Sequence, residues 1–134
     1  MKLVLDTNVF ISSFFWGGNP RKVMMRIVDG KDMLFVSNEI LQEVFSVMAR
    51  PKFGIDHRQV THFIDSIEEI SYRVNLLGLV QGVCRDSDDD KILECGVLGK
   101  VDFIISGDND LLSLKEFQGI PIITASEYMD KMGG

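Results

Sequence analysis

The sequence predicts an α/β fold with a mainly parallel sheet and helices on both of its faces. Short apolar runs rich in β-branched residues alternate with longer segments in which apolar residues recur at helical spacing. Strands that are separated by helices pair in parallel, because each crossover returns the chain to the same end of the sheet. The chain shows no repeat, low-complexity segment or linker, and 134 residues suit one core, so a single domain over residues 1–134 is expected.

The first elements are a strand and a helix. Residues 2–5, KLVL, form a short apolar run that predicts a buried strand. Residues 19–30, NPRKVMMRIVDG, predict a helix with Asn19 as its N-cap and Gly30 at its end. The aromatic run at 14–16 is expected in a hydrophobic loop between them.

The middle of the chain continues the alternation. Residues 32–37, DMLFVS, predict the second strand, and the helix that follows has Ser37 or Asn38 as its cap. Residues 56–73 predict one or two helices, and RVNLL at 73–77 suggests another short strand.

The last third repeats the pattern. Residues 89–100 predict a helix, residues 102–108 a strand, and residues 120–129 a strand that runs into a short helix capped by Ser126. In an open parallel sheet the ligand site lies at the carboxyl ends of the strands.

Negative charge is concentrated in one part of the chain. The net charge is -6, and residues 86–110 hold eight acids against two lysines, so the remainder is balanced. An acidic protein is ordinarily a poor partner for nucleic acids, since phosphates are contacted by Lys and Arg. A local carboxylate cluster that holds divalent cations reverses this, because the bound cations present positive charge to a phosphate.

The apolar start is too short for a secretion signal, and no apolar span approaches the ~18 residues of a membrane helix. A cytoplasmic location is therefore expected. Cys84 and Cys95 are expected to be reduced, and their spacing predicts neither a disulfide scaffold nor a zinc site.

Four carboxylates from separate segments are predicted to meet at the carboxyl edge of the sheet. Asp6 and Asp108 each follow a predicted strand, while Glu43 and Asp89 lie on the apolar faces of their helices, near the first turn. Each acid alone has an ordinary explanation, as a turn former or a helix-dipole partner. Their coincidence predicts hard cations, Mg²⁺ or Mn²⁺, because several buried carboxylates repel one another unless they bind cations or protons.

Two such ions, roughly 4 Å apart, would activate a water and stabilise the leaving oxygen of a phosphodiester. Asp86, one turn before Asp89, is the best candidate for a second inward carboxylate of the acidic run. Arg50 and Lys52 are candidate substrate-binding residues for phosphates, although the end of a helix favours cations for its own reasons. His57 and His62 are expected on the surface.

Four motifs in order resemble the PIN-domain family, and within it the prokaryotic subgroup of toxins from toxin–antitoxin pairs. The motifs are LDTNVFIS, ILQEVFSVMARPKF, DSDDDKILECG and IISGDNDLL, and the similarity extends from Leu3 to about Tyr128. Each motif alone is weakly specific, whereas the ordered set is specific. Ser106 stands where Thr is commoner in the family, and Gly96 where Ala is usual.

The resemblance implies metal-binding acids at Asp6, Glu43, Asp89 and Asp108, with Asp86, Asp90 and Asp110 as possible additional ligands and Asn8 and Ser106 as hydrogen-bonding supports. Because the third motif is a run of acids, its register is uncertain by one residue, and Asp90 could replace Asp89. The resemblance also implies an α/β/α sandwich, Mg²⁺- or Mn²⁺-dependent endoribonuclease activity, a protein antitoxin that blocks the site, and a homodimer.

Two alternatives compete with the nuclease. A phosphoacceptor domain also places Asp at strand ends, but the phosphatase pattern needs a second Asp where Asn8 stands, and the other residues of a receiver are not evident. The second alternative is a non-catalytic PIN-like module that binds RNA or protein. The presence of all four acids argues against it without excluding it.

Overall fold

The structure, a computed structural model, describes residues 1–133 and contains one six-stranded sheet. The strands are β1 (Lys2–Leu5), β2 (Met33–Val36), β3 (Ser71–Arg73), β4 (Phe103–Ile105), β5 (Glu116–Phe117) and β6 (Ile120–Ile123), in the spatial order β3-β2-β1-β4-β6-β5. All neighbours pair in parallel except β5 and β6. The predicted α/β fold with a mainly parallel sheet is confirmed.

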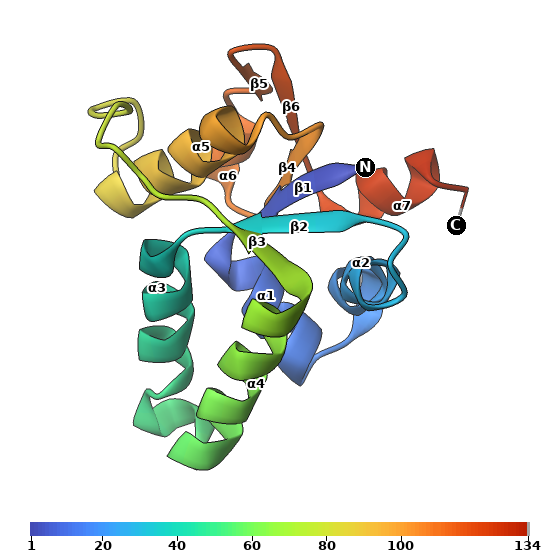
Figure 1. The fold of residues 1–134 in the computed structure, drawn as a ribbon, viewed down its shortest axis with the longest axis vertical. Helices are drawn as coiled ribbons and strands as arrows, with labels where there is room; N and C mark the ends of the chain where they lie inside the picture. Colours follow the sequence, from blue (N-terminus) through green and yellow to red (C-terminus); the bar gives the residue numbers. More distant parts are fainter. Residues whose placement is uncertain (134) are drawn as a thin grey trace.

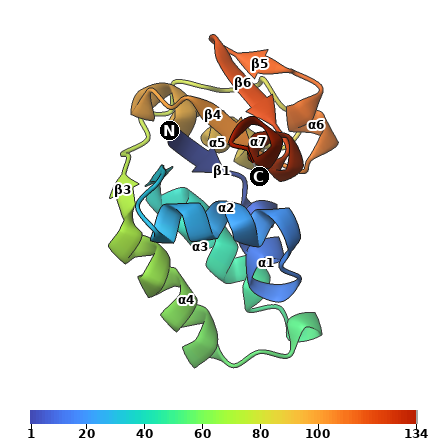
Figure 2. The same cartoon turned by 90° about the vertical axis from the view of Figure 1, so that its right-hand side faces the viewer.

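Helices cover both faces of this sheet, as in a three-layer sandwich. They are α1 (Thr7–Phe15), α2 (Gly18–Val28), α3 (Asn38–Met48), α4 (His57–Ile70), α5 (Ser87–Gly99), α6 (Asn109–Leu112) and α7 (Ala125–Lys131), with a short 3-10 turn η1 (Pro51–Phe53). Figure 1 shows α5 above the sheet and α1 to α4 below it. Helix α7 packs against α2, and the two lie next to each other in Figure 2.

The core is built on the two central strands. The side chains of Leu3, Val4 and Leu5 in β1 are fully buried, as are those of Ile104 and Ile105 in β4. Such apolar strands are typical of a parallel sheet covered on both faces. Their carboxyl ends are therefore held rigidly, and the residues that follow them inherit fixed positions.

Helix α5 approaches β4 closely because Gly96 has no side chain. A Cβ atom at Gly96 would lie 2.8 Å from Cδ1 of Ile104, closer than such atoms normally pack. The glycine therefore lets the second half of α5, the helix that carries Asp89, pack directly against Ile104 of β4.

Two expectations about the first third of the chain were wrong. Phe14 and Phe15 do not lie in a loop, because α1 begins directly after Asp6 and extends through Phe15; Trp16 lies in the turn that follows. Helix α2 starts from Gly17, whose φ of 75° suits glycine, so Asn19 lies inside the first turn and is not the cap. Burial of Val9 and Phe10 under the sheet stabilises a helix that the sequence pattern did not show.

Smaller differences occur later in the chain. A single helix, α4, is capped by a reciprocal Asp56–Gln59 pair. Strand β3, at Ser71–Arg73, overlaps the predicted 73–77 strand only at Arg73. Thr124, and not Ser126, caps α7. Helix α6 was not predicted, nor was strand β5, which forms a hairpin with the predicted β6. Among residues 1–133, no helix combines the length and apolarity needed to span a membrane.

Candidate metal centre

Asp6 is placed by the junction between the two central strands. Its backbone N–H donates to the carbonyl of Ile105 at 2.9 Å, which ties the end of β1 to the end of β4. Its carboxylate is buried, and Oδ2 accepts a hydrogen bond of 2.8 Å from the Ser106 hydroxyl. Ser106 thus holds the Asp6 carboxylate by a hydrogen bond.

The same serine also positions Asp108. The Ser106 Oγ accepts the backbone N–H of Asp108 at 2.9 Å, and Asp108 caps α6 by accepting the N–H of Asp110 at 2.9 Å. One hydroxyl therefore links the Asp6 carboxylate to the backbone of Asp108, in a different segment. Its geometry depends on the turn that follows β4.

Asp89 joins these residues from α5, which covers the face of the sheet opposite to α1 (Figure 1). It lies in the first turn of α5 and is buried, and one oxygen from each of Asp89, Asp108 and Asp110 lies within 4.8 Å of the other two. Asp86 is the exposed N-cap of α5, and its carboxylate accepts the N–H of Asp88 at 2.9 Å.

Glu43 reaches the same region from α3. Its Oε2 accepts a hydrogen bond of 2.8 Å from the hydroxyl of Thr7, the residue next to Asp6. Its carboxylate is not among the three that approach within 4.8 Å. The role of Thr7 was missed in the sequence, although its place directly after Asp6 was the available signal.

The carboxyl groups of Asp6 and Asp89 resist ionisation in the absence of a cation. Burial raises the pKa of Asp6 to about 6, and the charges of Asp108 and Glu43 add to this effect against the Ser106 bond. Burial also raises the pKa of Asp89, reinforced by the charges of Asp108 and Asp6.

The pKa of Glu43 is raised as well, first by burial and then by the charges of Asp88 and Asp86. A set of oxygen donors whose ionised forms destabilise one another fits a hard divalent cation such as Mg²⁺ or Mn²⁺. Asp6, Asp89 and Asp108, with Asp110 beside them, are the residues that could hold it.

Asp90 has a different environment from Asp89. Its two carboxylate oxygens accept backbone N–H groups from Gly82 at 3.0 Å and Cys84 at 2.8 Å. The carboxylate is thus satisfied by the loop that precedes α5. This geometry favours Asp89 over Asp90 as the acid that faces the centre.

Glu94, which the sequence did not single out, has a similar structural role. It is buried, and its carboxylate accepts the N–H groups of Leu77 at 2.6 Å, Gly78 at 3.0 Å and Val80 at 2.8 Å. Burial alone would raise its pKa, but the backbone donors outweigh that effect and lower it. An acid one turn after Asp90, inside an apolar helix segment, was the signal available.

The remaining candidates are not gathered at the centre. Asn8 is exposed, and its side chain makes no hydrogen bond within residues 1–133, so its support of the acids stays a prediction. Arg50 and Lys52 are exposed and follow the far end of α3, where Lys52 Nζ lies 5.1 Å from the Phe53 ring centre. Both remain candidates for phosphate contacts at a distance from the carboxylates.

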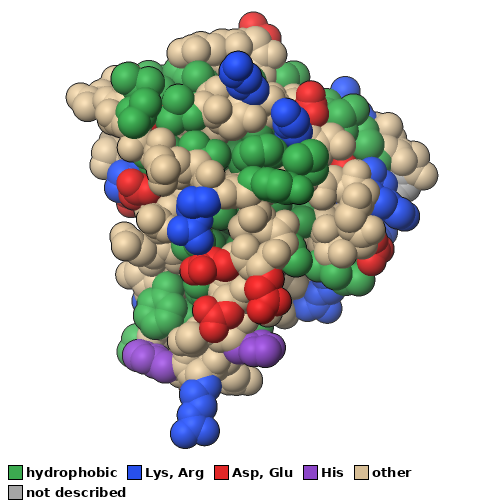
Figure 3. All heavy atoms as spheres, in the orientation of Figure 1, with side chains coloured by type: hydrophobic (Ala, Val, Ile, Leu, Met, Phe, Trp, Pro, Cys, Tyr) green, Lys and Arg blue, Asp and Glu red, His purple; other side chains and the backbone are tan. Residues whose placement is uncertain are grey.

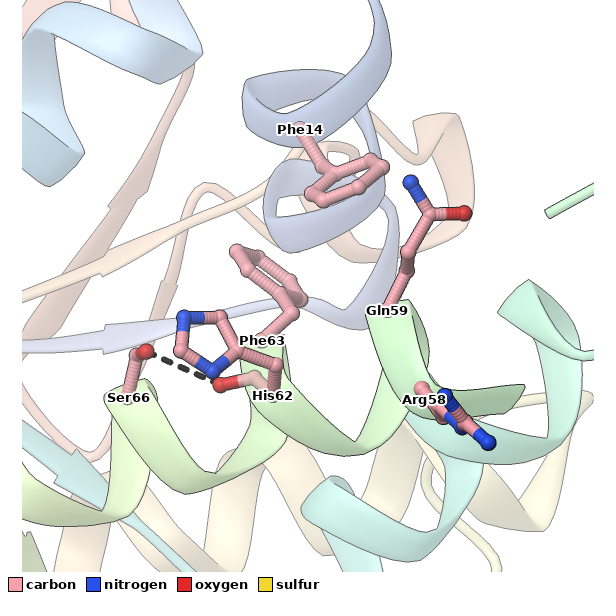
Figure 4. A pocket seen from close by; sticks show the side chains of 6 residues that line it. All are labelled: Phe14, Arg58, Gln59, His62, Phe63 and Ser66. Atoms are coloured by element: carbon pink, nitrogen blue, oxygen red, sulfur yellow. Dashed lines mark hydrogen bonds between the residues drawn. The ribbon is translucent and has the colours of Figure 1, made fainter. Parts of the chain in front are cut away.

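The histidines belong to another surface. Both are exposed, and Figure 3 shows them on the lower part of the face that α4 occupies. His62 and Arg58 border a groove of about 480 Å³ between α1 and α4. Phe14 and Phe63 face each other inside it with ring centres 5.0 Å apart (Figure 4). No carboxylate of the metal centre lines this groove.

Comparison with known proteins agrees with this architecture. The model of the PIN domain family matches residues 2–110. An uncharacterized protein of Methanocaldococcus jannaschii is 33% identical over 121 residues, which cover 87% of this chain and 76% of that protein. A chain in the crystal structure of VapBC2 from Rickettsia felis, bound to a DNA fragment from its promoter, shares the fold with a TM-score of 0.64. That match covers 91% of this chain and 97% of the other at 11% identity. The chain therefore belongs to the PIN domain family.

Proposed function

We propose that this protein is a divalent-metal-dependent endoribonuclease. The observation that carries the proposal is the approach of the Asp89, Asp108 and Asp110 oxygens to within 4.8 Å, beside a buried Asp6. No Lys or Arg side chain forms an ion pair with these four acids in the described part of the chain. The mutual repulsion of these acids is then relieved by protons or by a bound cation, and we propose the cation.

Each residue of the centre has a distinct task. Asp6, Asp89 and Asp108 hold Mg²⁺ or Mn²⁺, with Glu43 completing the site and Asp110 and Asp86 as further candidate ligands. Thr7 and Ser106 orient Glu43 and Asp6 through their hydroxyl donors. When bound, the cation supplies water activation and charge stabilisation for phosphodiester hydrolysis.

The biological setting is proposed from similarity. The motifs resemble toxins of toxin–antitoxin pairs, and the fold is shared with a chain of the VapBC2 complex. We therefore expect a protein antitoxin as partner, a homodimer, RNA as substrate and a cytoplasmic location. Arg50 and Lys52 would contact phosphates of the RNA away from the scissile bond.

The test is cleavage of a mixed pool of structured and single-stranded RNAs in Mn²⁺, in Mg²⁺ and in chelator. Asp6→Asn and Asp89→Asn should abolish metal-dependent cleavage. Asp65→Asn is the control, because Asp65 is exposed on α4 and its charge is not among those that raise the pKa of Asp6, Glu43 or Asp89. Cleavage that survives in Asp6→Asn or in chelator would contradict the proposal.

The alternative, a non-catalytic module that binds RNA or protein, predicts a different result. Such a module would leave every RNA intact while retaining binding, and metal titration would show whether the carboxylates still hold a cation. The raised pKa values of Asp6 and Asp89 favour a working centre, because unused acids in a core are costly to retain.

A further inference from the structure

A second groove, of about 260 Å³, opens directly beside the carboxylates. It lies between α1, the start of α2, the turn after β4 and the segment that enters α7. Its polar lining residues are Asn8, Ser12, Asn19, Ser106, Thr124 and Ser126, with Gly107 in the turn after β4. Ser106 lines the groove and also donates to Asp6, so the groove and the metal centre share a wall.

The groove is neutral, whereas the region beside it is strongly acidic. None of its lining residues is charged, and Val9, Pro20 and Ala125 give it apolar walls. A polyanion that brings one phosphate to the carboxylates meets the least repulsion on a neutral side. Apolar walls with a few polar groups are typical of pockets that bind small organic groups.

Four of the polar side chains that line the groove are free to bind a ligand. The side chains of Asn8, Ser12, Asn19 and Ser126 make no hydrogen bond within residues 1–133. Two amides and two hydroxyls supply both donors and acceptors, which is what base edges and ribose hydroxyls require. A Cβ at Gly107 would meet nothing within 4 Å, so the boundary with the centre is open.

We infer that this groove binds the nucleoside of single-stranded RNA that adjoins the scissile phosphate, and that Asn8, Asn19 and Ser126 contact its base and ribose. The strand must be single because a base can enter such a groove only when it is unstacked and unpaired. This inference rests on the proposed ribonuclease function. If the groove binds this nucleoside, its side chains determine which nucleotide is preferred next to the cleavage site.

The first test fills the groove. Ser126 is exposed and makes no side-chain bond, so Ser126→Tyr should fold normally and place a ring in the groove. We expect KM for a single-stranded RNA to rise about tenfold with kcat and metal affinity little changed. Asp130→Tyr, an exposed position on α7 outside the groove, is the control and should leave KM within about twofold.

The second test reads specificity. Asn19→Ala should change the preferred nucleotide at the cut in a randomised RNA pool, since an amide that reads a base edge carries sequence preference. Unchanged KM in Ser126→Tyr together with an unchanged pattern in Asn19→Ala would overturn the inference while leaving the nuclease in place.

A third measurement does not depend on cleavage. Titration of the metal-free protein with the four nucleoside 5′-monophosphates, followed by NMR, should shift the Asn8, Asn19 and Ser126 amides, and Ser126→Tyr should suppress those shifts. A wild-type protein that shows these shifts but cuts no RNA would refute the proposed nuclease and still support the groove. Shifts that are absent, or confined to other residues, would refute the groove.

Discussion

Asp89 and Asp90 are adjacent in the first turn of α5, and both are buried, yet they have opposite environments. The Asp90 oxygens accept two backbone N–H groups from the preceding loop. Asp89 instead faces Asp108 and Asp110, and its pKa is raised by burial and by the charges of Asp108 and Asp6. The carboxylate of Asp90 is therefore satisfied by backbone donors of the protein, and that of Asp89 is not.

Glu94 extends this comparison along the helix. Like Asp90, Glu94 binds the loop at residues 77–84. The two carboxylates together accept five hydrogen bonds from backbone N–H groups of this loop. The comparison teaches that burial of an acid does not identify a site. What distinguishes the candidate centre is the absence of sufficient donors around carboxylates that lie close together.

The largest expected effect separates Asp89 from Asp90. Asp89→Asn should reduce metal-dependent RNA cleavage by at least about 1,000-fold, because it removes a negative ligand from the centre. Asp90→Asn should act mainly on stability, since it weakens the bonds to the loop. Cleavage rates and chemical denaturation of both variants are the measurements. Loss of cleavage in a fully stable Asp90→Asn would reverse the two roles.

The next effect concerns Glu94. Glu94→Gln should lower the free energy of unfolding by about 3 kcal/mol, because charge-assisted bonds to three backbone donors are weakened and one amide N–H group faces them. Urea denaturation gives this value. Glu69→Gln, on the exposed face of α4, is the control and should change it by less than about 0.5 kcal/mol. Equal changes in the free energy of unfolding of the two variants would contradict the structural role of Glu94.

A smaller effect is the pH dependence of stability in the metal-free protein. The pKa of Asp6 is about 6 in the folded state against 3.8 in the unfolded chain, so the folded state binds the extra proton between these values. Stability should therefore fall as pH rises from about 4 to 6, by about 2 kcal/mol, and Asp89 extends the fall toward neutral pH. Thermal unfolding in chelator at several pH values measures it.

Asp6→Asn supplies the control for this pH dependence, because an amide does not titrate. The variant should be less sensitive to pH between about 4 and 6, and Mn²⁺ should stabilise the wild type more than the variant at pH 7. Wild-type stability that rises over the same pH range would contradict the raised pKa of Asp6.

The smallest effect tests the approach of α5 to β4. Gly96→Ala gains helix propensity of about 1 kcal/mol, but its Cβ meets Cδ1 of Ile104 at 2.8 Å, so we expect a net loss of about 1 kcal/mol. Adding Ile104→Val removes that atom and should recover most of the loss. A double-mutant cycle with no coupling between the two positions would contradict the contact.

Much of this protein was predictable from its sequence because its strongest signals are local. The apolar runs of β1, β2, β4 and β6 and the helical spacing of α3 and α5 predicted the sheet and its carboxyl edge. From that edge followed the expectation that Asp6, Asp89 and Asp108 share one region. Strand order does not have to be known for this, since all strands of a parallel sheet end on the same side.

Only the tertiary structure decided how the acids divide their roles. Asp89 and Asp90 are chemically identical in the sequence, and the difference between them depends on a loop that folds back onto α5. The helix α1 was hidden because its stability comes from packing under the sheet, and not from its own pattern. The partnership of Thr7 with Glu43 joins residues 36 positions apart, a distance that local pattern cannot bridge.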